Sequence, residues 1–392
     1  MTKKKIGLLI IGINGAIGTT VTAGVKAINS NYVEPIGLVT EIFEFKKLDF
    51  VNLKDLVIGG WDIIEKPHME CMKSHNIIPE TLYNKLVSDG MDVTVYKAPR
   101  AGITIHNLNV DGVHKDKKSI TISEAIKSIT DDINDFVSKN NLDGCVVGNL
   151  SSCEPLPENC EIFNSIEVFE KAIENNDSRI KASVVYAYAA IKNHAPFFNF
   201  TPNYTIDIPA IKELAIREKI SIAGNDGKTG QTLYKTVIAP MLKWRNLKLF
   251  GWYSTNILGN NDGRVLEDPS HKEAKIKSKS KVLDKILGYS DFYHRVDINY
   301  YPPRGDAKEA WDTVDFKGWL GKEMCMKINW IGEDSTLAAP LIVDITRLLW
   351  YTQKKGDYGV AKHLSSFFKD PSENDDYSFG NQVQMLLNYL SN

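Results

Sequence analysis

The feature that most constrains this fold is a continuous apolar run that ends in a glycine-rich turn near the N-terminus. Residues 5–11, KIGLLII, have the unbroken apolar character of a strand buried in a parallel sheet. Gly12, Gly15 and Gly18 follow at once, and residues 19–28 are the small and apolar residues of a packed helix. Strand, glycine turn and helix in this order predict an α/β fold with a Rossmann-type domain.

The glycine turn is suited to the pyrophosphate of a dinucleotide. Glycines permit positive φ and a close approach of the backbone, and the N–H groups at the helix start are directed at the anion. The spacing is GxxGxxG rather than GxGxxG, so a tight turn without a ligand is the alternative. The predicted cofactor-binding residues of this turn are Gly12, Ile13, Asn14, Gly15, Ala16, Ile17 and Gly18.

Polar residues that follow other predicted turns and strands extend the predicted cofactor site. A second strand is expected over residues 35–40, and it ends near Glu41, where a ribose-binding acid or a helix cap would stand. Two glycines before Trp61 suggest a sharp turn, after which Asp62 either accepts from a ribose or caps a helix. Residues 143–149 read as a buried strand, and ligands lie at the carboxyl ends of such strands. We therefore add Asp62, Asn149 and Ser151.

A second glycine-rich segment, IAGNDGKTGQT over residues 222–232, resembles a phosphate-binding loop that leads into a helix over residues 231–242. It lacks the GxxxxGK[ST] spacing, which argues against a nucleoside triphosphatase loop. The alternative is a capped helix start, with Thr229 or Thr232 as the N-cap.

The pattern of strands changes in the C-terminal half. Residues 247–253, 296–301 and 325–331 read as strands of alternating or aromatic character, unlike the buried strands before them. This change predicts an inserted α+β domain over residues 245–340, with the Rossmann-type domain formed by residues 1–244 and 341–392. Residues 338–349 and 358–369 are expected to be helices.

Six lysines stand within residues 272–285, eight residues after the turn NILGNNDG. A solvated helix is the plain interpretation, and an anion site is the alternative. Residues four apart share one helix face, so Lys275 and Lys279 can project into one pocket, whereas Lys277, Lys281 and Lys285 would face elsewhere. A desolvated lysine near other cations can also transfer protons near neutral pH.

The composition of this chain argues against some classes of binding partner. The formal net charge is −2, and no apolar run is long enough to span a bilayer, so we expect neither a nucleic acid nor a membrane partner. Five cysteines without CxxC spacing are typical of a cytoplasmic protein. HxxxH and HExxH motifs are absent, which leaves any metal unknown, since an oxygen-ligand site has no such signature.

Several segments in order resemble the inositol-3-phosphate synthase (myo-inositol-1-phosphate synthase) family. They are GINGAIGTT, GGWDI, DGKTGQT, NILGNNDG, KIKSKSKVLD, GDAKEAWD, GEDSTLAAPLIVD and FFKDP, and they extend from Gly12 to about Pro371. Asn14 stands where a glycine is common in the family, and residues 199–203 differ from its usual NGSPQ-like segment.

The resemblance implies a reaction and a set of site residues. The reaction is the redox-neutral conversion of glucose 6-phosphate to 1D-myo-inositol 3-phosphate, with NAD as cofactor and a divalent metal or monovalent cation as an open question. The implied catalytic residues are Lys275, Lys279, Lys308 and Lys369, and the implied substrate-binding residues are Asp226, Thr229, Gly230, Gln231, Thr232, Asn256, Leu258 and Asp262. Asp306 and Asp334 are counted with the cofactor-binding residues, where they would orient lysines; structural ion pairing is the alternative.

The resemblance also implies a homotetramer assembled through the inserted sheet. Two other functions stay open at this point. A net NAD(P)-dependent dehydrogenase of a phosphorylated metabolite would accumulate NADH, and a nucleotide-binding scaffold would have no turnover.

Overall fold

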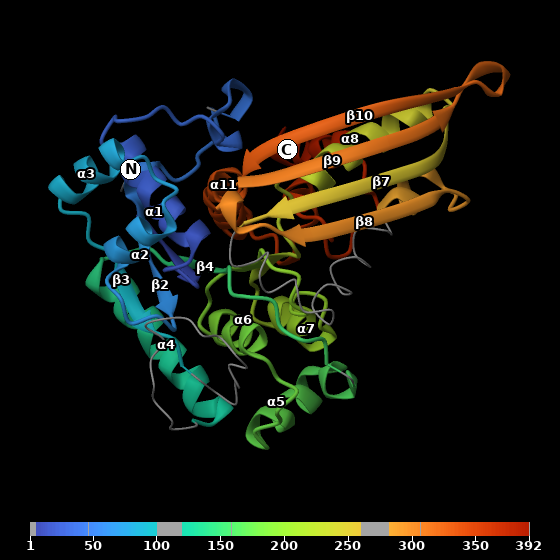
Figure 1. The fold of residues 1–392 in the computed structure, drawn as a ribbon. Coiled ribbons are helices and arrows are strands. Elements are labelled where there is room, and N and C mark those ends of the chain that lie inside the picture. The colour runs from blue at the N-terminus through green and yellow to red at the C-terminus, as the bar shows by residue number, and fades with distance from the viewer. Residues whose placement is uncertain are drawn as a thin grey trace. The chain divides into compact units, whose positions relative to one another are not determined.

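The computed structural model describes residues 5–45, 47–99, 120–157, 159–259, 282–305 and 307–391, which divide into two units with one sheet each (Figure 1). The first unit contains residues 1–227 and 339–362, and the second contains residues 228–338 and 363–392. The predicted boundaries, 244/245 and 340/341, differ from this division. The helix over residues 231–244 and the C-terminal segment group with the second sheet.

The first unit is built on a parallel sheet in the order β11-β6-β5-β4-β1-β2-β3. Its strands are β1 (Ile6–Ile11), β2 (Leu56–Asp62), β3 (Thr94–Lys97), β4 (Cys145–Asn149), β5 (Phe197–Asn199), β6 (Ser221–Gly224) and β11 (Gly359–Val360). The chain adds β2 and β3 on one side of β1 and β4 to β6 on the other. The carboxyl end of β1 is therefore the switch point at which doubly wound sheets bind ligands.

Helices between the strands pack around this sheet and on one another. They are α1 (Ala16–Asn29), α2 (His68–His75), α3 (Glu80–Ser88), α4 (Ile122–Lys139), α5 (Ile166–Glu174), α6 (Ala182–Lys192), α7 (Pro209–Arg217) and α11 (Asp334–Lys355), the last divided between the units at residue 339. A capping box of Thr121 and Glu124 starts α4, which buries Ile129, Ile133 and Phe136 at helical spacing against the sheet.

Two predictions for the first unit were wrong. Residues 35–40 form no strand, and a short 3₁₀ helix, Val39–Glu41, stands there instead. Gly59 and Gly60 make no sharp turn, since they lie inside β2. A Cβ on Gly60 would lie 2.0 Å from the carbonyl oxygen of Ile10, so the glycine is required by close strand packing.

The second unit is a sheet of four strands in the order β10-β9-β7-β8. Its elements are β7 (Lys248–Leu258), β8 (Tyr293–Tyr300), β9 (Ala307–Lys317), β10 (Glu323–Glu333), α8 (Gln231–Trp244) and α12 (Phe379–Ser391). The β7–β8 pair is parallel, and the other two pairs are antiparallel. Helix α8 lies behind this sheet in Figure 1, and Ala239 and Leu242 pack with Leu249, Trp252 and Val314.

The prediction of a helix over residues 358–369 was also wrong. Residues 359–360 form β11, which pairs with β6, and a 3₁₀ helix, Lys362–Phe367, follows. Within the described ranges, no helix is both long and apolar enough to cross a membrane.

Candidate active site

The glycine turn after β1 lies at the switch point of the first sheet, and its geometry is suited to an anion. Gly12 has a φ of +86°, and its N–H donates to the carbonyl of Trp61 at 2.8 Å. Helix α1 begins after Gly15, with no side-chain cap and no acidic residue in its first turn. A Cβ on Gly18 would lie 2.4 Å from the carbonyl oxygen of Ile13, so only glycine lets this helix turn pack on the loop. The helix N–H groups are left for an anion.

Asp62 holds the glycine turn in place from the end of β2. One carboxylate oxygen accepts from the backbone N–H of Asn14 at 2.8 Å, and the other accepts from that of Ile64 at 2.9 Å. Burial raises the pKa of Asp62, although these backbone N–H groups act in the opposite direction. Asp62 thus shapes the loop, and its contact with a ribose stays a prediction.

The side chain of Asn14 is buried and ties the turn to the segment after β2. Its Nδ2 donates to the carbonyls of Ile64 and Lys66, at 3.3 Å each. Its Oδ1 lies 2.8 Å from Nδ1 of His68, and because this oxygen can only accept, Nδ1 must carry the proton. Burial and the nearby His75 lower the pKa of His68 to about 4.

A chain of amides crosses the carboxyl ends of three neighbouring strands. Asn149 accepts from the backbone N–H and hydroxyl of Ser151, and it donates to Asn199 at 3.0 Å. Asn199 donates in turn to Asn225 at 2.9 Å. The backbone N–H of Leu150 donates to Ile11, so the chain of amides begins beside the glycine turn. The sequence prediction missed Asn199 and Asn225, although an amide at the end of each strand was the available signal.

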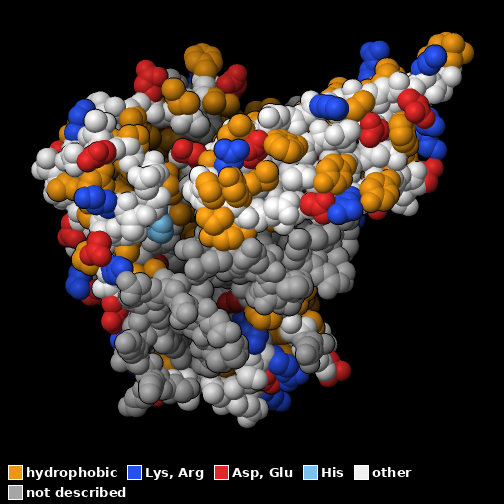
Figure 2. Space-filling view, in the orientation of Figure 1, with side chains coloured by type: hydrophobic (Ala, Val, Ile, Leu, Met, Phe, Trp, Pro, Cys, Tyr) orange, Lys and Arg blue, Asp and Glu red, His pale blue; other side chains and the backbone are white. Residues whose placement is uncertain are grey.

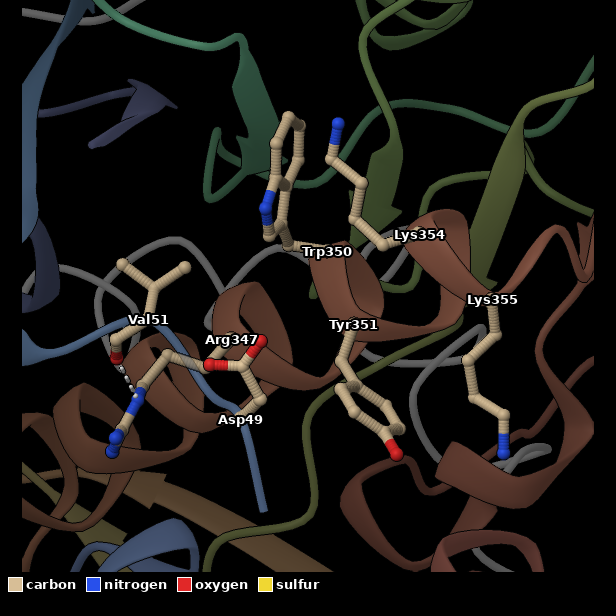
Figure 3. Close-up of a pocket in the computed structure, with 7 residues that line it drawn as sticks. All are labelled: Asp49, Val51, Arg347, Trp350, Tyr351, Lys354 and Lys355. Atoms are coloured by element: carbon tan, nitrogen blue, oxygen red, sulfur yellow. Dashed lines mark hydrogen bonds between the residues drawn. The ribbon is translucent and has the colours of Figure 1, made fainter. Parts of the chain in front are cut away.

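Glu41 makes an ion pair instead of standing at the end of a second strand. Arg347 Nη1 lies 2.7 Å from its carboxylate, and Arg347 Nε donates to the carbonyl of Val51 at 2.8 Å. Figure 3 shows the hydrogen bond between Arg347 and Val51 in a pocket that is also lined by Asp49, Trp350, Tyr351, Lys354 and Lys355. No residue of this pocket belongs to the predicted site.

The second unit brings four of the predicted site residues, Thr229, Gly230, Lys308 and Asp334, together at the start of α8. The hydroxyl of Thr229 donates to Asp334 Oδ1 at 2.9 Å, and Lys308 Nζ lies 3.7 Å from the other oxygen of Asp334. Gly230 is the N-cap of α8, and neither a side-chain cap nor an acidic residue in the first turn neutralises this helix end. The Lys308 ammonium group and this helix N-terminus attract a phosphate group, and the negative charge of the Asp334 carboxylate beside them acts in the opposite direction.

Gln231 and Asn256 form a buried pair next to this helix start. Asn256 Nδ2 donates to Gln231 Oε1 at 2.9 Å, and Gln231 Nε2 donates to Asp312 at 2.8 Å. Asp312 is buried on β9, and the sequence prediction missed it because its partners come from α8 and β7.

The remaining predicted residues have other surroundings. Thr232 is buried in α8, and Leu258 packs with Val296 and Ile298 in a small hydrophobic cluster. Lys369 is half-buried after the 3₁₀ helix of residues 362–367, and Asp226 belongs to the first unit. Lys275, Lys279, Asp262 and Asp306 lie outside the described residues.

The glycine turn at the switch point of a parallel sheet defines the first unit as a Rossmann-type dinucleotide-binding domain. Residues 6–392 match the family model described as myo-inositol-1-phosphate synthase. The chain belongs to this family of NAD-binding enzymes.

Individual relatives agree with this assignment. The chain is 37% identical to inositol-3-phosphate synthase 1 of Bacteroides thetaiotaomicron, over 94% of its own length and 89% of the relative's. It is similar to the crystal structure of inositol-3-phosphate synthase from Caenorhabditis elegans, with a TM-score of 0.89, 25% identity, and coverage of 100% and 86% of the two chains. A myo-inositol-1-phosphate synthase-related protein from Thermotoga maritima has a TM-score of 0.83 and 26% identity, with coverage of 99% and 98%.

These findings confirm several of the sequence predictions. The family, the α/β fold class, the enzyme class of inositol-3-phosphate synthase and NAD as the cofactor are those that the motifs indicated. The roles of individual residues stay predictions.

Proposed function

We propose that this protein converts D-glucose 6-phosphate to 1D-myo-inositol 3-phosphate. The observation that carries the proposal is the uncapped start of α8 beside Lys308 and Asp334. This arrangement offers a helix N-terminus and an ammonium group to a phosphate ester. The family relationship supports this choice of substrate.

The first unit is proposed to hold NAD through the turn of residues 12–18, with Asp62, Asn149 and Ser151 around it. The uncapped start of α1 fits a pyrophosphate, and Gly18, which has no Cβ, lets this helix pack closely on the turn at Ile13. Bound NAD would supply the hydride acceptor for the oxidation at C5 of the sugar phosphate and the hydride donor for the later reduction at the same carbon. Asp306 is proposed to contribute to the same cofactor site.

The lysines are proposed to stabilise the anions that the reaction creates. Lys275 accepts the proton of the C5 hydroxyl, and loss of a C6 proton gives an enolate that attacks the C1 aldehyde. Lys279 and Lys308 bind the phosphate and the developing oxyanions, while Lys369 is placed at the C1 or C5 oxygen. Asp334, which pairs with Lys308 at 3.7 Å, orients that ammonium group. Preorganised cations of this kind typically contribute about a hundredfold or more each.

The test is to incubate the purified protein with glucose 6-phosphate and NAD⁺, and to follow both phosphorus NMR and NADH absorbance. We expect inositol phosphate without net NADH. Stoichiometric NADH would instead indicate a net dehydrogenase, and no turnover would indicate a scaffold. Assays with a chelator, with added divalent metals and with ammonium determine the cation requirement. If no inositol phosphate appears under any of these conditions, the proposal is wrong.

We further propose a cytoplasmic homotetramer assembled through the open face of the second unit's sheet. Figure 2 shows hydrophobic side chains over these strands, and Tyr253, Tyr293, Trp311 and Ile331 are 41%, 64%, 50% and 64% exposed. Exposed aromatic side chains that stand among charged ones such as Arg295 and Lys327, as on this sheet face, are typical of a protein interface. No disulfide joins the five cysteines, all of which are described, as a reducing compartment requires. Light scattering on the wild type and on Trp311→Asp tests the tetramer, which should dissociate in the variant, and cell fractionation tests the location.

A further inference from the structure

A buried carboxylate on β9 organises the side chains at the start of α8. Asp312 is 2% exposed and accepts four hydrogen bonds. Gln231 Nε2 donates at 2.8 Å and Trp252 Nε1 at 2.6 Å, and the hydroxyls of Tyr234 and Ser254 complete the set. Donors from α8 and β7 thus converge on one group that can only accept.

This convergence determines which way the neighbouring amides are turned. Because Asp312 offers no donor, Gln231 must direct its NH₂ group towards Asp312 and its oxygen towards Asn256. Asn256 must then direct its own NH₂ group towards Gln231, at 2.9 Å. The backbone carbonyl of Asp297, also an acceptor only, lies 3.4 Å from the same nitrogen and favours the same orientation.

This orientation turns the side-chain oxygen of Asn256, Oδ1, away from Gln231. Asn256 is fully buried, and within the described part of the chain its Oδ1 has no hydrogen-bond donor. A buried acceptor without a partner is unfavourable, and such groups commonly mark the position of a bound molecule. A phosphate dianion can only accept and would repel this oxygen. A hydroxyl group can donate to it.

We propose that Asp312 is a positioning residue that, through Gln231, turns Asn256 to present a bare acceptor to one hydroxyl of the sugar phosphate. This inference rests on the proposed function, because the hydroxyl belongs to that substrate. It separates two tasks within the second unit. The α8 start and Lys308 are suited to the phosphate. Asn256 favours a sugar carbon that carries a hydroxyl group over the same carbon without one.

The substitution Asp312→Asn reverses this polarity with little change in shape. Trp252 Nε1 can only donate, so the single oxygen of the new amide faces Trp252 and its NH₂ group faces Gln231. Gln231 and then Asn256 would turn over, and Asn256 would present a donor. The wild type should bind one of the 2-, 3-, 4- and 5-deoxy analogues of glucose 6-phosphate about 10- to 100-fold more weakly than glucose 6-phosphate itself. Asp312→Asn should bind the two with similar affinity.

The measurement is calorimetric binding of glucose 6-phosphate and the four analogues to the NAD⁺-loaded protein, with turnover measured in parallel. Asp291→Asn is the matched control. It makes the same chemical change at an exposed carboxylate paired with Lys248, and it should keep the wild-type preference. Asn256→Leu removes the acceptor at nearly constant volume and should abolish the preference, which provides a test even if Asp312→Asn folds poorly.

Two outcomes would overturn the inference while leaving the proposed function standing. One is a wild type that turns over glucose 6-phosphate but binds all four analogues as tightly as the substrate. The other is a folded Asp312→Asn or Asn256→Leu variant that keeps the wild-type preference. A wild type that forms no inositol phosphate refutes the proposed function, and the inference with it.

Discussion

Replacing Lys228 with methionine should stabilise the protein at neutral pH. Lys228 is 3% exposed, and its ammonium group donates to Gln382 Oε1 at 2.6 Å. The ring of Phe379 lies 5.8 Å away. Burial lowers the pKa of Lys228 to about 7 from its ordinary value of 10.5. The folded protein thus carries a charge that water would solvate better.

The pKa difference sets the size and the pH range of the effect. This lowering of the pKa corresponds to an upper limit of about 4–5 kcal/mol in the free energy of unfolding at pH 7 or below. The lost bond to Gln382 removes about 1 kcal/mol of this gain, so we expect a net stabilisation of roughly 1–3 kcal/mol. Between pH 7 and 10.5 the unfolded chain binds more protons at this position than the folded one. The wild type therefore gains stability as pH rises through this range, and the advantage of the variant shrinks.

Urea unfolding followed by tryptophan fluorescence measures this difference at about pH 6.5, 8 and 9.5. Lys243→Met, at an exposed position of α8, is the control and should change stability little at any pH. An advantage of Lys228→Met that stays constant from pH 7 to 9.5 would refute the assignment of the effect to a buried charge. A variant that is less stable than the wild type at pH 7 would do so as well.

The remaining predictions concern the glycine turn, the buried His68 and the ammonium group of Lys308. Gly18→Ala should weaken NAD⁺ binding about tenfold or more, because its Cβ would lie 2.4 Å from Ile13, whereas Gly24→Ala on the same helix has open space and should bind normally in calorimetry. The wild type should lose up to about 3 kcal/mol as pH falls from 6.5 towards 4, because the folded state resists protonation of His68; His68→Gln should flatten this pH dependence in urea titrations. Lys308→Ala should lower kcat about a hundredfold, and an equal loss in Lys317→Ala, at the exposed end of β9, would contradict the assigned role.

Local sequence patterns correctly predicted strands that have apolar surroundings on both faces. The runs predicted at residues 5–11 and 143–149 contain β1 (Ile6–Ile11) and β4 (Cys145–Asn149), because both faces of a central parallel strand are apolar and this property is visible in a short window. Residues 35–40 have a similar composition but form a turn. Asp344 accepts hydrogen bonds from the N–H groups of Val39 and Thr40 at 2.7 and 2.9 Å. A residue about 300 positions away thus supplies the acceptors that a neighbouring strand would otherwise supply.

Pairing with a strand that is distant in the sequence also explains why residues 358–369 do not form the predicted helix. Val360 pairs with Ile222 at the edge of the first sheet, and the N–H of Ala361 donates to Ile222 at 2.8 Å. Helical periodicity in the local sequence carries no information about this edge. Tertiary hydrogen bonds decided the conformation of the segment.

The sequence by itself determined the glycine turn, the family and the cofactor, because these depend on residue types at fixed spacing along one stretch of chain. It also named Gln231 and Asn256 as substrate-binding residues. Only the tertiary structure decided which atom Asn256 presents. An amide can donate or accept, and the choice is made by Asp312 on β9 and the carbonyl of Asp297 on β8, which the fold brings beside α8.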